Sequence, residues 1–423
     1  MRVAAIPSGV VVPAGQDLVV DLFGQFDANG HGAVGATIPH IVRGERLQPA
    51  ARAWDFAAIS MAVVAADEGC PRTGSADGWT RQINLTVAVA DSNFWAGQAA
   101  HMARMLAFLT GDMWTLSFIS GGHQPAPGKN AAGRPEDVVC LLSGGLDSLI
   151  GALDLVKQGK KPLFVSQVAK GDKQQQRVFA HTISPGSLHL QMNHNARMPH
   201  PSERSQRARS MGFFGFAALA ATSLKAYEGG GRVQLVIPEN GYISVNVPLT
   251  PLRLGSLSTR TTHPHFLAML QQVFDAAGLR IHITNPYQLK TKGEMLNECL
   301  DQPKLKALAS QSTSCGRYAR SGFRQCGRCV PCLVRRAAFE EWGAGDATKY
   351  RFDDLGKAGA KHRDFDDVRS AAVAVHTLNS LGIEGWVGGA LNSVTLGERP
   401  SLGAVAERGL REIERLLAAQ GAL

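Results

Sequence analysis

Apolar and polar residues alternate along two stretches near the start of the chain, and a third stretch has the spacing of a helix. Residues 16–26 and 82–90 alternate as half-buried strands do, and residues 96–109 place apolar side chains three and four positions apart. Residues 115–118 can return as a further strand. These elements predict a small N-terminal α+β domain.

A stretch rich in glycine, proline and small residues, Gly121 to Pro135, separates this region from a different pattern. Beyond it, short apolar runs alternate with segments of helical spacing. The runs predict strands at 138–142, 163–168, 187–193, 232–238 and 279–284, with helices at 147–158, 203–227 and 265–277. This alternation is typical of an α/β fold in which a doubly wound parallel sheet has helices on both faces.

Further helical patterns follow at 366–381 and 402–417 and contain no chemical motif. We therefore divide the chain into an N-terminal domain, a linker, an α/β domain and a helical C-terminal region, with bounds at 1–125, 126–136, 137–345 and 346–423. Ligands of doubly wound sheets bind at the carboxyl ends of the strands, where the winding reverses. The candidate binding segments follow three of the predicted strands and are 170–176, 239–264 and 286–293.

Length and composition describe a globular protein of two or three domains, with 423 residues, 44% hydrophobic and 19% charged. No apolar run reaches the roughly 18 residues of a membrane-spanning helix. Pro7 and Gly9 interrupt the start of the chain where a signal peptide needs an apolar stretch. We expect a cytoplasmic protein without membrane contact. The net charge of +9 leaves nucleic acid or another acidic partner open.

The most informative motif is Ser143-Gly-Gly-Leu-Asp-Ser148, which lies between a predicted strand and a predicted helix. Backbone N–H groups of such a turn converge on an anion, and the positive end of the helix dipole adds to the attraction. A Walker loop has Lys-Ser/Thr after its last glycine, where this chain has Leu146-Asp147-Ser148. The motif therefore predicts a phosphate site other than a kinase-like γ-phosphate site. The alternative is a strand-turn-helix unit whose glycines serve packing.

This string resembles the PP-loop of ATP pyrophosphatases, which have the adenine nucleotide alpha hydrolase-like type of doubly wound sheet. The resemblance implies that ATP binds with Mg²⁺, that a substrate oxygen attacks the α-phosphate, and that AMP and pyrophosphate are the products. It also implies which residues bind the leaving pyrophosphate, namely Ser143, Gly144, Gly145, Leu146, Asp147 and Ser148.

Four of the seven cysteines lie close together, in the pattern Cys-x10-Cys-x2-Cys-x2-Cys. Four thiolates at this spacing predict a closed tetrahedral zinc knuckle with a structural role, and an iron–sulfur cluster is the alternative. The predicted ligands are Cys315, Cys326, Cys329 and Cys332. Six arginines and no acidic residue lie between Cys315 and Arg336, and these can neutralise the thiolates.

The two motifs together resemble the QueC family, the 7-cyano-7-deazaguanine synthases, over residues 137–345. The resemblance implies adenylation of the carboxylate of 7-carboxy-7-deazaguanine, attack by ammonia, and a second activation that gives the nitrile. It also implies a structural zinc ion and a homodimer. By this resemblance Lys292 faces the phosphates, and Arg209 matches a family arginine beside which Ser210 replaces asparagine. The implied catalytic residues are Asp147, Ser148, Lys292 and Arg209.

Two departures from the family pattern concern the deazaguanine rather than ATP. Lys170-Gly-Asp-Lys-Gln-Gln175 replaces a Tyr-Gly-Gln segment, and Ser258-Thr-Arg-Thr-Thr-His-Pro264 replaces a Tyr-x-Asp-Cys stretch. With its added N-terminal domain, the chain looks closer to the QueC-like component of Qat anti-phage defence systems and to related CBASS proteins. That branch implies transfer of a 7-deazaguanine acyl group to a protein amine on a partner from the same defence operon.

The longest candidate segment supplies the residues that we assign to the substrate, which are Glu239, Asn240, Tyr242, Arg253, Arg260 and His263. The first three can read a base edge, although Asn-Gly is also an ordinary turn signal. The last three can polarise the acyl oxygen or bind phosphate, and a capping or surface role is the alternative for each. Three functions compete: protein ligation, ammonia-dependent nitrile or amide synthesis, and nucleotide sensing by a zinc protein that binds nucleic acid.

Overall fold

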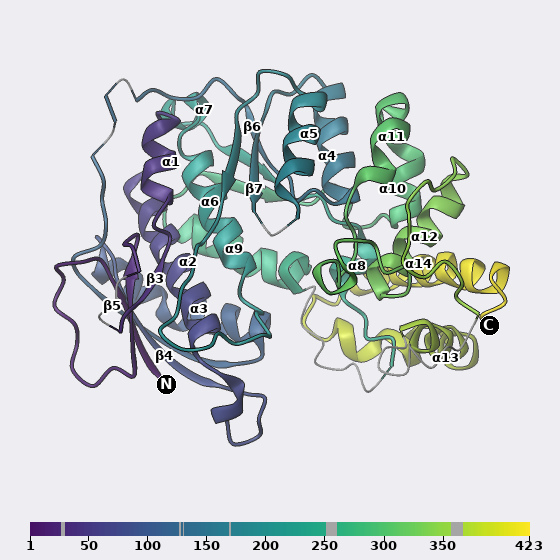
Figure 1. Ribbon diagram of the computed structural model, residues 1–423, viewed down its shortest axis with the longest axis horizontal. Coiled ribbons are helices and arrows are strands. Elements are labelled where there is room, and N and C mark those ends of the chain that lie inside the picture. The colour runs from purple at the N-terminus through teal and green to yellow at the C-terminus, as the bar shows by residue number, and fades with distance from the viewer. Residues whose placement is uncertain (27–29, 127, 130, 169–170, 251–259, 357–366) are drawn as a thin grey trace.

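The computed structural model describes the chain except residues 27–29, 127, 130, 169–170, 251–259 and 357–366, and its strands form two five-stranded sheets (Figure 1). Every strand pairing within both sheets is parallel. The first sheet contains β1 (Arg2–Ile6), β2 (Leu18–Leu22), β3 (Gly32–Val34), β4 (Gln82–Ala88) and β5 (Met113–Ile119). The second contains β6 (Val138–Leu141), β7 (Pro162–Gln167), β8 (His189–Met192), β9 (Val233–Val236) and β10 (Ile281–Thr284).

Both sheets have the same strand order. The first is ordered β3-β2-β1-β4-β5, and the second, read from its β8 edge, is ordered β8-β7-β6-β9-β10. In each sheet the winding reverses between the first and fourth strands, so the second sheet has its topological switch point between β6 and β9. This confirms the predicted doubly wound α/β architecture.

The N-terminal region is α/β rather than the predicted α+β, because its strands are parallel and its helices lie between them in the chain. The strands predicted at residues 82–90 and 115–118 are present as β4 and β5. Their side chains alternate between buried and exposed positions because one face of the sheet meets solvent there. Such alternation is usual in antiparallel sheets, and it does not reveal strand direction.

The helices of more than one turn are α1 (Ile38–Gly44), α2 (Ala51–Gly69), α3 (Ser92–Thr110), α4 (Leu146–Lys157), α5 (Lys173–Ile183), α6 (Ser210–Ala221), α8 (Gly241–Val245), α9 (Pro264–Ala276), α10 (Lys292–Glu298), α11 (Gln302–Leu308), α12 (Val330–Trp342), α13 (Asp367–Val387) and α14 (Arg399–Ala419). A short α7 (Lys225–Glu228) and 3₁₀ turns at Arg72–Gly74, Arg260–Thr262, Ala309–Gln311, Ala319–Ser321 and Gly388–Leu391 complete the described helices.

Helix α2 packs against α6 on one side and against strands β2, β3 and β4 of the first sheet on the other (Figure 1). Every residue of α2 from Ala53 to Gly69 is buried. One hydrophobic cluster includes α2, α6, α9 and strands of both sheets. The two sheets therefore share a core, and the boundaries that we expect near residues 125 and 137 stay predictions.

The helix predicted over residues 203–227 is interrupted, and only α6 and α7 are helical there. The segment before α6 is bound to the end of α2 instead, because the Glu203 N–H donates to the Glu68 carbonyl and the Ala208 N–H donates to the Asp67 carboxylate. These bonds satisfy backbone groups that a helix would otherwise pair.

The C-terminal helices form a separate hydrophobic cluster that α13 and α14 share with α8 and α12. Figure 1 shows α14 running beside α12 and α8. Another cluster packs α4 and α5 against α10, α11 and α12. Helix α14 thus lies against two elements, α8 and α10, that begin within the predicted site segments 239–264 and 286–293.

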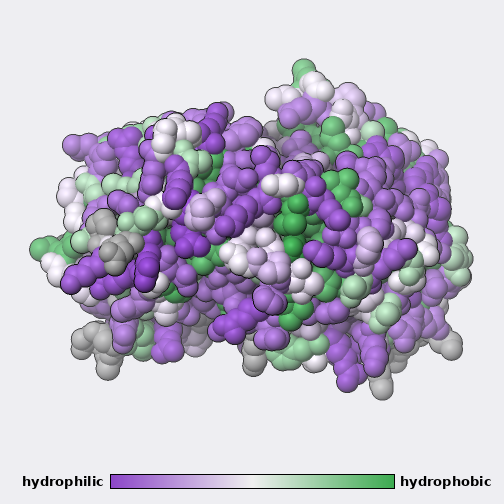
Figure 2. All heavy atoms as spheres, turned by 90° about the horizontal axis from the view of Figure 1, so that it is seen from above, coloured by the Kyte–Doolittle hydropathy of each residue, from purple (hydrophilic) through white to green (hydrophobic). Residues whose placement is uncertain are grey.

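The surface is mainly hydrophilic on the face drawn in Figure 2, where hydrophobic residues gather to the right of centre. Among the helices in the described part of the chain, none is both long and apolar enough to cross a membrane.

Candidate active site

The loop Ser143–Gly145 joins β6 to α4 and has the geometry expected of an anion-binding turn. Gly144 has a φ of +87°, which a glycine adopts without strain. The Ser143 Oγ accepts a hydrogen bond from the Gly145 N–H at 3.2 Å and lies 3.1 Å from the Ser148 Oγ. Helix α4 begins directly after Gly145, so its N-terminal amides and dipole point toward the loop.

Two neighbouring segments hold this loop from either side. Gln176 of α5, which is fully buried, donates from its Nε2 to the Ser143 carbonyl at 3.2 Å. The Thr313 N–H donates to the Gly144 carbonyl at 3.0 Å. Thr313 precedes Cys315 by two residues, so the cysteine segment is connected directly to the phosphate loop.

Asp147, Asn240 and Lys292 meet in a buried cluster beside the loop. The Lys292 Nζ lies 2.5 Å from the Asp147 Oδ1. The Asp147 Oδ2 accepts hydrogen bonds from the Asn240 backbone N–H at 3.0 Å and from its side-chain Nδ2 at 2.7 Å. Asp147 comes from the first turn of α4, Asn240 follows β9, and Lys292 opens α10. These three segments gather at the switch point between β6 and β9, as the sequence predicted.

The Glu239 carboxyl completes this cluster as the second acid. It is hydrogen-bonded to Asp147, and its Oε1 accepts from the Asn240 Nδ2 at 3.2 Å. Burial, together with the charge and hydrogen bond of Asp147, raises the pKa of Glu239 well above its ordinary value. Burial alone would raise the pKa of Asp147 too, but the Lys292 charge and hydrogen bonds lower it to about 2. The shared environment therefore favours the ionised form of Asp147 and the protonated form of Glu239.

The resulting set of groups suits a polyphosphate and its counter-ion. Backbone amides, a helix N-terminus and the Lys292 ammonium attract phosphate oxygens. Two adjacent carboxyl groups supply the hard oxygen ligands that a divalent cation prefers.

Arg209 lies at the N-cap of α6, away from Asp147, and it is exposed. Its charge acts on Glu68 of α2, on Asp172 and on His194. Burial and the neighbouring Asp67 raise the pKa of Glu68 to about 7, against the lowering effect of Arg209. Asp172 and His194 follow β7 and β8, so Arg209 belongs to the same carboxyl edge of the sheet, two strands from the switch point.

The other residues assigned to the substrate occupy different surroundings. Tyr242 is buried against α14, where its ring contacts Gly409. Arg260 donates to the Phe108 carbonyl at 2.8 Å and lies over the Phe108 ring, and His263 caps α9. Arg253 lies outside the described residues. The structure thus joins Glu239 and Asn240 to the phosphate loop, whereas Arg260 and His263 contact the end of α3.

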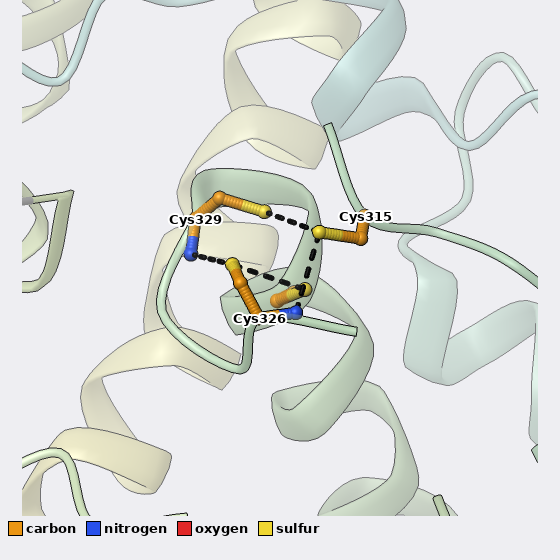
Figure 3. A group of neighbouring side chains, drawn as sticks. Cys315, Cys326 and Cys329 are labelled. Carbon is orange, nitrogen blue, oxygen red and sulfur yellow. Dashed lines mark hydrogen bonds between the residues drawn. The ribbon is translucent and has the colours of Figure 1, made fainter. Parts of the chain in front are cut away.

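The four predicted metal ligands form one compact buried group (Figure 3). Their Sγ atoms all lie within 4.8 Å of one another, and none forms a disulfide. The Cys326–Cys332 and Cys315–Cys329 Sγ pairs are 3.8 and 3.9 Å apart. Zinc–sulfur bonds of about 2.3 Å put tetrahedral sulfurs about 3.8 Å apart. The group can therefore hold one metal ion such as zinc, and its size favours a single ion over a cluster with bridging sulfides.

Arginines of this segment have structural hydrogen bonds, as Arg328, Arg335 and Arg336 show. The Arg328 and Arg336 guanidinium groups donate to backbone carbonyls of residues 352–355. Arg335 is fully buried and donates to the Ala309 carbonyl and to side chains of Ser312 and Thr348. These arginines bind the segment after α12 to the cysteine group. Part of the chain's excess positive charge therefore serves contacts inside the protein.

Sequence reasoning did not assign Gln176, Thr313 or Glu412, which all support the site. Gln176 lies in the candidate segment 170–176. The rule that ligands bind at the carboxyl ends of the strands (the strand-end rule) could therefore have identified it. Thr313 acts through its backbone N–H, which no residue type reveals. Glu412 lies in a helix without any motif and reaches α10 across 121 positions of the chain.

Two comparisons with known proteins agree with this geometry. The family described as "Queuosine biosynthesis protein QueC" matches residues 261–343, from the turn before α9 to the end of α12. A 7-cyano-7-deazaguanine synthase of Aromatoleum aromaticum is 25% identical over 240 residues, which are 52% of this chain and 99% of that protein. The matched segment contains Lys292 and all four cysteines. Together the two similarities support a QueC-like family.

Proposed function

We propose, taking a QueC-like family as the premise, that this protein uses ATP to adenylate the carboxylate of 7-carboxy-7-deazaguanine and then transfers the acyl group to an amine. In the first step a carboxylate oxygen bonds to the α-phosphorus and pyrophosphate leaves. In the second step the amine nitrogen bonds to the acyl carbon, a proton is lost from that nitrogen, and AMP leaves. Both similarities support the broader class, an enzyme of the ATP pyrophosphatase or ligase type.

The main support is the meeting of Lys292 and Asp147 with the phosphate loop at the switch point between β6 and β9. Charge develops on the bridging oxygen as pyrophosphate departs. Amides of the loop and the Lys292 ammonium are fixed donors that stabilise this charge more than they stabilise bound ATP. The absence of a Walker-type lysine after Gly145 agrees with a reaction at the α-phosphate rather than at the γ-phosphate.

We assign Asp147 and Glu239 as the residues that would hold the Mg²⁺ bound to ATP, because they are the paired acids beside the loop. Bound there, the ion would neutralise charge on the departing pyrophosphate. The raised pKa of Glu239 opposes this role, and the charge of a bound cation would favour loss of the carboxyl proton.

A protein amine is the acceptor that we propose, on a partner from the same defence operon. An acyl-adenylate reacts with an unprotonated amine that is held beside it, so placement of the amine decides the product. The N-terminal region adds a surface at the carboxyl edge of the second sheet, the edge at which the phosphate loop lies. Its helix α2 packs on α6, and its Glu68 lies 3.6 Å from His194, directly after β8.

Ammonia is the second candidate acceptor, favoured by the name of the matched relative, a 7-cyano-7-deazaguanine synthase. Ammonia would give the free amide, and a second activation would give the nitrile. The phosphate loop and its partners serve both reactions equally, since the two differ only in the nucleophile that attacks the acyl-adenylate.

One experiment distinguishes these functions. The protein is incubated with ATP, Mg²⁺, 7-carboxy-7-deazaguanine and either ammonium or the products of neighbouring genes, and all products are followed by mass spectrometry. A mass gain on a neighbouring protein supports the first candidate, and a small amide or nitrile supports the second. Failure to form AMP in every mixture, together with salt-sensitive nucleic-acid binding, would favour the nucleotide-sensing alternative. The Lys292→Met variant is the control for AMP from a contaminating enzyme.

A further inference from the structure

Helix α14 contacts the start of α10, the helix that begins with Lys292. Glu412 of α14 is buried, and its carboxyl accepts a hydrogen bond from the Thr291 hydroxyl. Its second oxygen accepts from the Gly293 backbone N–H at 3.3 Å. Glu412 thus binds the residues on both sides of Lys292.

The same helix end is held by a second residue of α14. Thr291 and Glu294 form a capping box, in which the Glu294 N–H donates to the Thr291 Oγ1 and the Thr291 N–H donates to the Glu294 carboxylate at 2.8 Å. The Arg408 Nε donates to that carboxylate at 2.6 Å. Two residues of α14, one turn apart, therefore bind both halves of the box that sets where α10 begins.

Close packing leaves α10 little freedom at this contact. A Cβ atom on Gly293 would lie 2.6 Å from the Glu412 Oε1, so only glycine lets the carboxyl reach the backbone there. On its other side α14 touches the segment that follows Asn240, because a Cβ on Gly409 would lie 2.4 Å from the Tyr242 ring. Helix α14 therefore packs against both segments that provide partners for Asp147.

We propose that Glu412 is a positioning residue, which fixes the first turn of α10 so that the Lys292 ammonium stays beside Asp147 and the phosphate loop. This inference rests on the proposed function for its catalytic consequence, although the position of Lys292 can be measured without it. Lys292 is the residue between the two that Glu412 binds, and its side chain is 8% exposed. Loss of these two hydrogen bonds frees the helix start and lets the ammonium leave its pocket.

The test compares Glu412→Ala, Glu412→Gln and the matched control Ile413→Val. Ile413 is fully buried on the same helix and belongs to the C-terminal cluster, so its shortening loosens α14 packing without removing a contact to α10. The glutamine variant keeps one acceptor oxygen for the Gly293 N–H, and its amide NH2 can donate to the Thr291 hydroxyl oxygen. Two readouts are taken. One is the rate at which an amine-reactive acetylating reagent labels Lys292, followed by peptide mass spectrometry, and the other is the rate of pyrophosphate release with ATP, 7-carboxy-7-deazaguanine and ammonium.

We expect Glu412→Ala to speed Lys292 labelling several-fold and to lower kcat about 100-fold, the scale of a misplacement near 1 Å. Glu412→Gln and Ile413→Val should stay near the wild-type values in both readouts. Equal labelling of Lys292 in Glu412→Ala and Ile413→Val would overturn the proposal. If Glu412→Ala does not fold, Thr291→Val removes the hydroxyl donor instead and is expected to give the same increase in labelling.

The two readouts separate this proposal from the proposed function. Faster labelling in Glu412→Ala, with no pyrophosphate release by any form including wild type, would support the positioning role and reject adenylation. Pyrophosphate release by the wild type, with unchanged labelling and unchanged kcat in Glu412→Ala, would reject the positioning role alone.

Discussion

Asp147 and Lys292 are 145 positions apart in the chain, yet the Asp147 Oδ1 and the Lys292 Nζ lie 2.5 Å apart in a buried pocket. The first turn of α4 and the first turn of α10 converge there, beside the phosphate loop. A buried ion pair of this kind is costly to break, because either partner alone would be a charge without compensation. The pair is therefore the feature that connects the stability of the site to its chemistry.

Removing one member of this pair should damage both folding and activity. Asp147→Asn leaves the Lys292 ammonium buried without its carboxylate, which is expected to cost about 3–5 kcal/mol in the free energy of unfolding. We expect the double variant Asp147→Asn/Lys292→Met to be destabilised by clearly less than the sum of the single variants. Urea unfolding of the four forms measures this coupling. Additive single effects would show that the pair does not interact.

Sequence patterns predicted the parts of the site that are formed by residues close together in the chain. The motif Ser143–Ser148 lies within one strand-turn-helix unit, so its loop, its anion-binding geometry and its place at a strand end all followed from short-range rules. The convergence of Glu239, Asn240 and Lys292 followed from the strand-end rule for doubly wound sheets. The pairing of the Asp147 and Glu239 carboxyl groups did not follow from that rule. The same glutamate side chain can read a base edge or pair with another acid, and the sequence does not distinguish these roles.

Other features were hidden because tertiary contacts determine them. Helix α2 is buried on all sides between the sheets, so it has no polar face and no amphipathic period to detect. The parallel direction of the N-terminal strands was hidden by the exposure of one sheet face. Glu412 looks like any acid of an amphipathic helix until α14 is placed against α10.

Loss of the metal should disturb the phosphate loop as well as the cysteine segment. Cys329→Ser is expected to abolish binding of one zinc ion per chain and to lower the melting temperature, since a closed four-cysteine site contributes directly to folding. Pyrophosphate release should fall with it, because Thr313 bonds the Gly144 carbonyl. Elemental analysis and thermal unfolding measure the first two effects.

The matched control for the metal prediction is Cys299→Ser, a buried cysteine outside the group. It should retain the metal. Iron and sulfide with visible absorption in the purified wild type would contradict a single zinc ion. Full pyrophosphate release after removal of the metal would contradict the link to the loop.

Glu412 should make stability depend on pH. Burial raises its pKa from 4.5 to about 7, with Glu341 and Glu294 adding to the rise and the hydrogen bonds from Thr291 and Gly293 opposing it. The folded state therefore holds this proton more tightly than the unfolded state. The resulting stability is present below pH 4.5 and is lost as the pH rises through 7. Between pH 5 and 8 the free energy of unfolding of Glu412→Gln should rise relative to that of wild type by on the order of 2 kcal/mol, measured by urea unfolding.

Glu407→Gln serves as the control for that comparison, because Glu407 lies on the same helix and is half-buried rather than buried. Its difference from wild type should not change with pH in this window. A pH-independent difference between wild type and Glu412→Gln would contradict a raised pKa at Glu412.

The N-terminal region should depend on a buried network of two acids and two arginines. The Asp112 carboxylate is fully buried and lies 2.7 Å from an Arg72 nitrogen and 2.6 Å from an Arg81 nitrogen, and Arg81 also pairs with Asp67. Asp112→Ala leaves two buried guanidinium groups short of a partner, and we expect a loss of about 3–5 kcal/mol. Asp275→Asn, which breaks an exposed pair with Arg232, should cost less than about 1 kcal/mol. Similar losses in both variants would contradict this account.

The central claim is that the substrate carboxylate attacks the α-phosphorus of ATP, and an oxygen label tests it most directly. 7-Carboxy-7-deazaguanine labelled with ¹⁸O in its carboxylate is incubated with ATP, Mg²⁺, the protein and ammonium as the acceptor amine, and the released nucleotide is analysed by mass spectrometry. Attack at the α-phosphorus transfers one labelled oxygen to the phosphate of AMP, together with stoichiometric pyrophosphate. Unlabelled AMP, or ADP with orthophosphate in place of AMP with pyrophosphate, would contradict the claim.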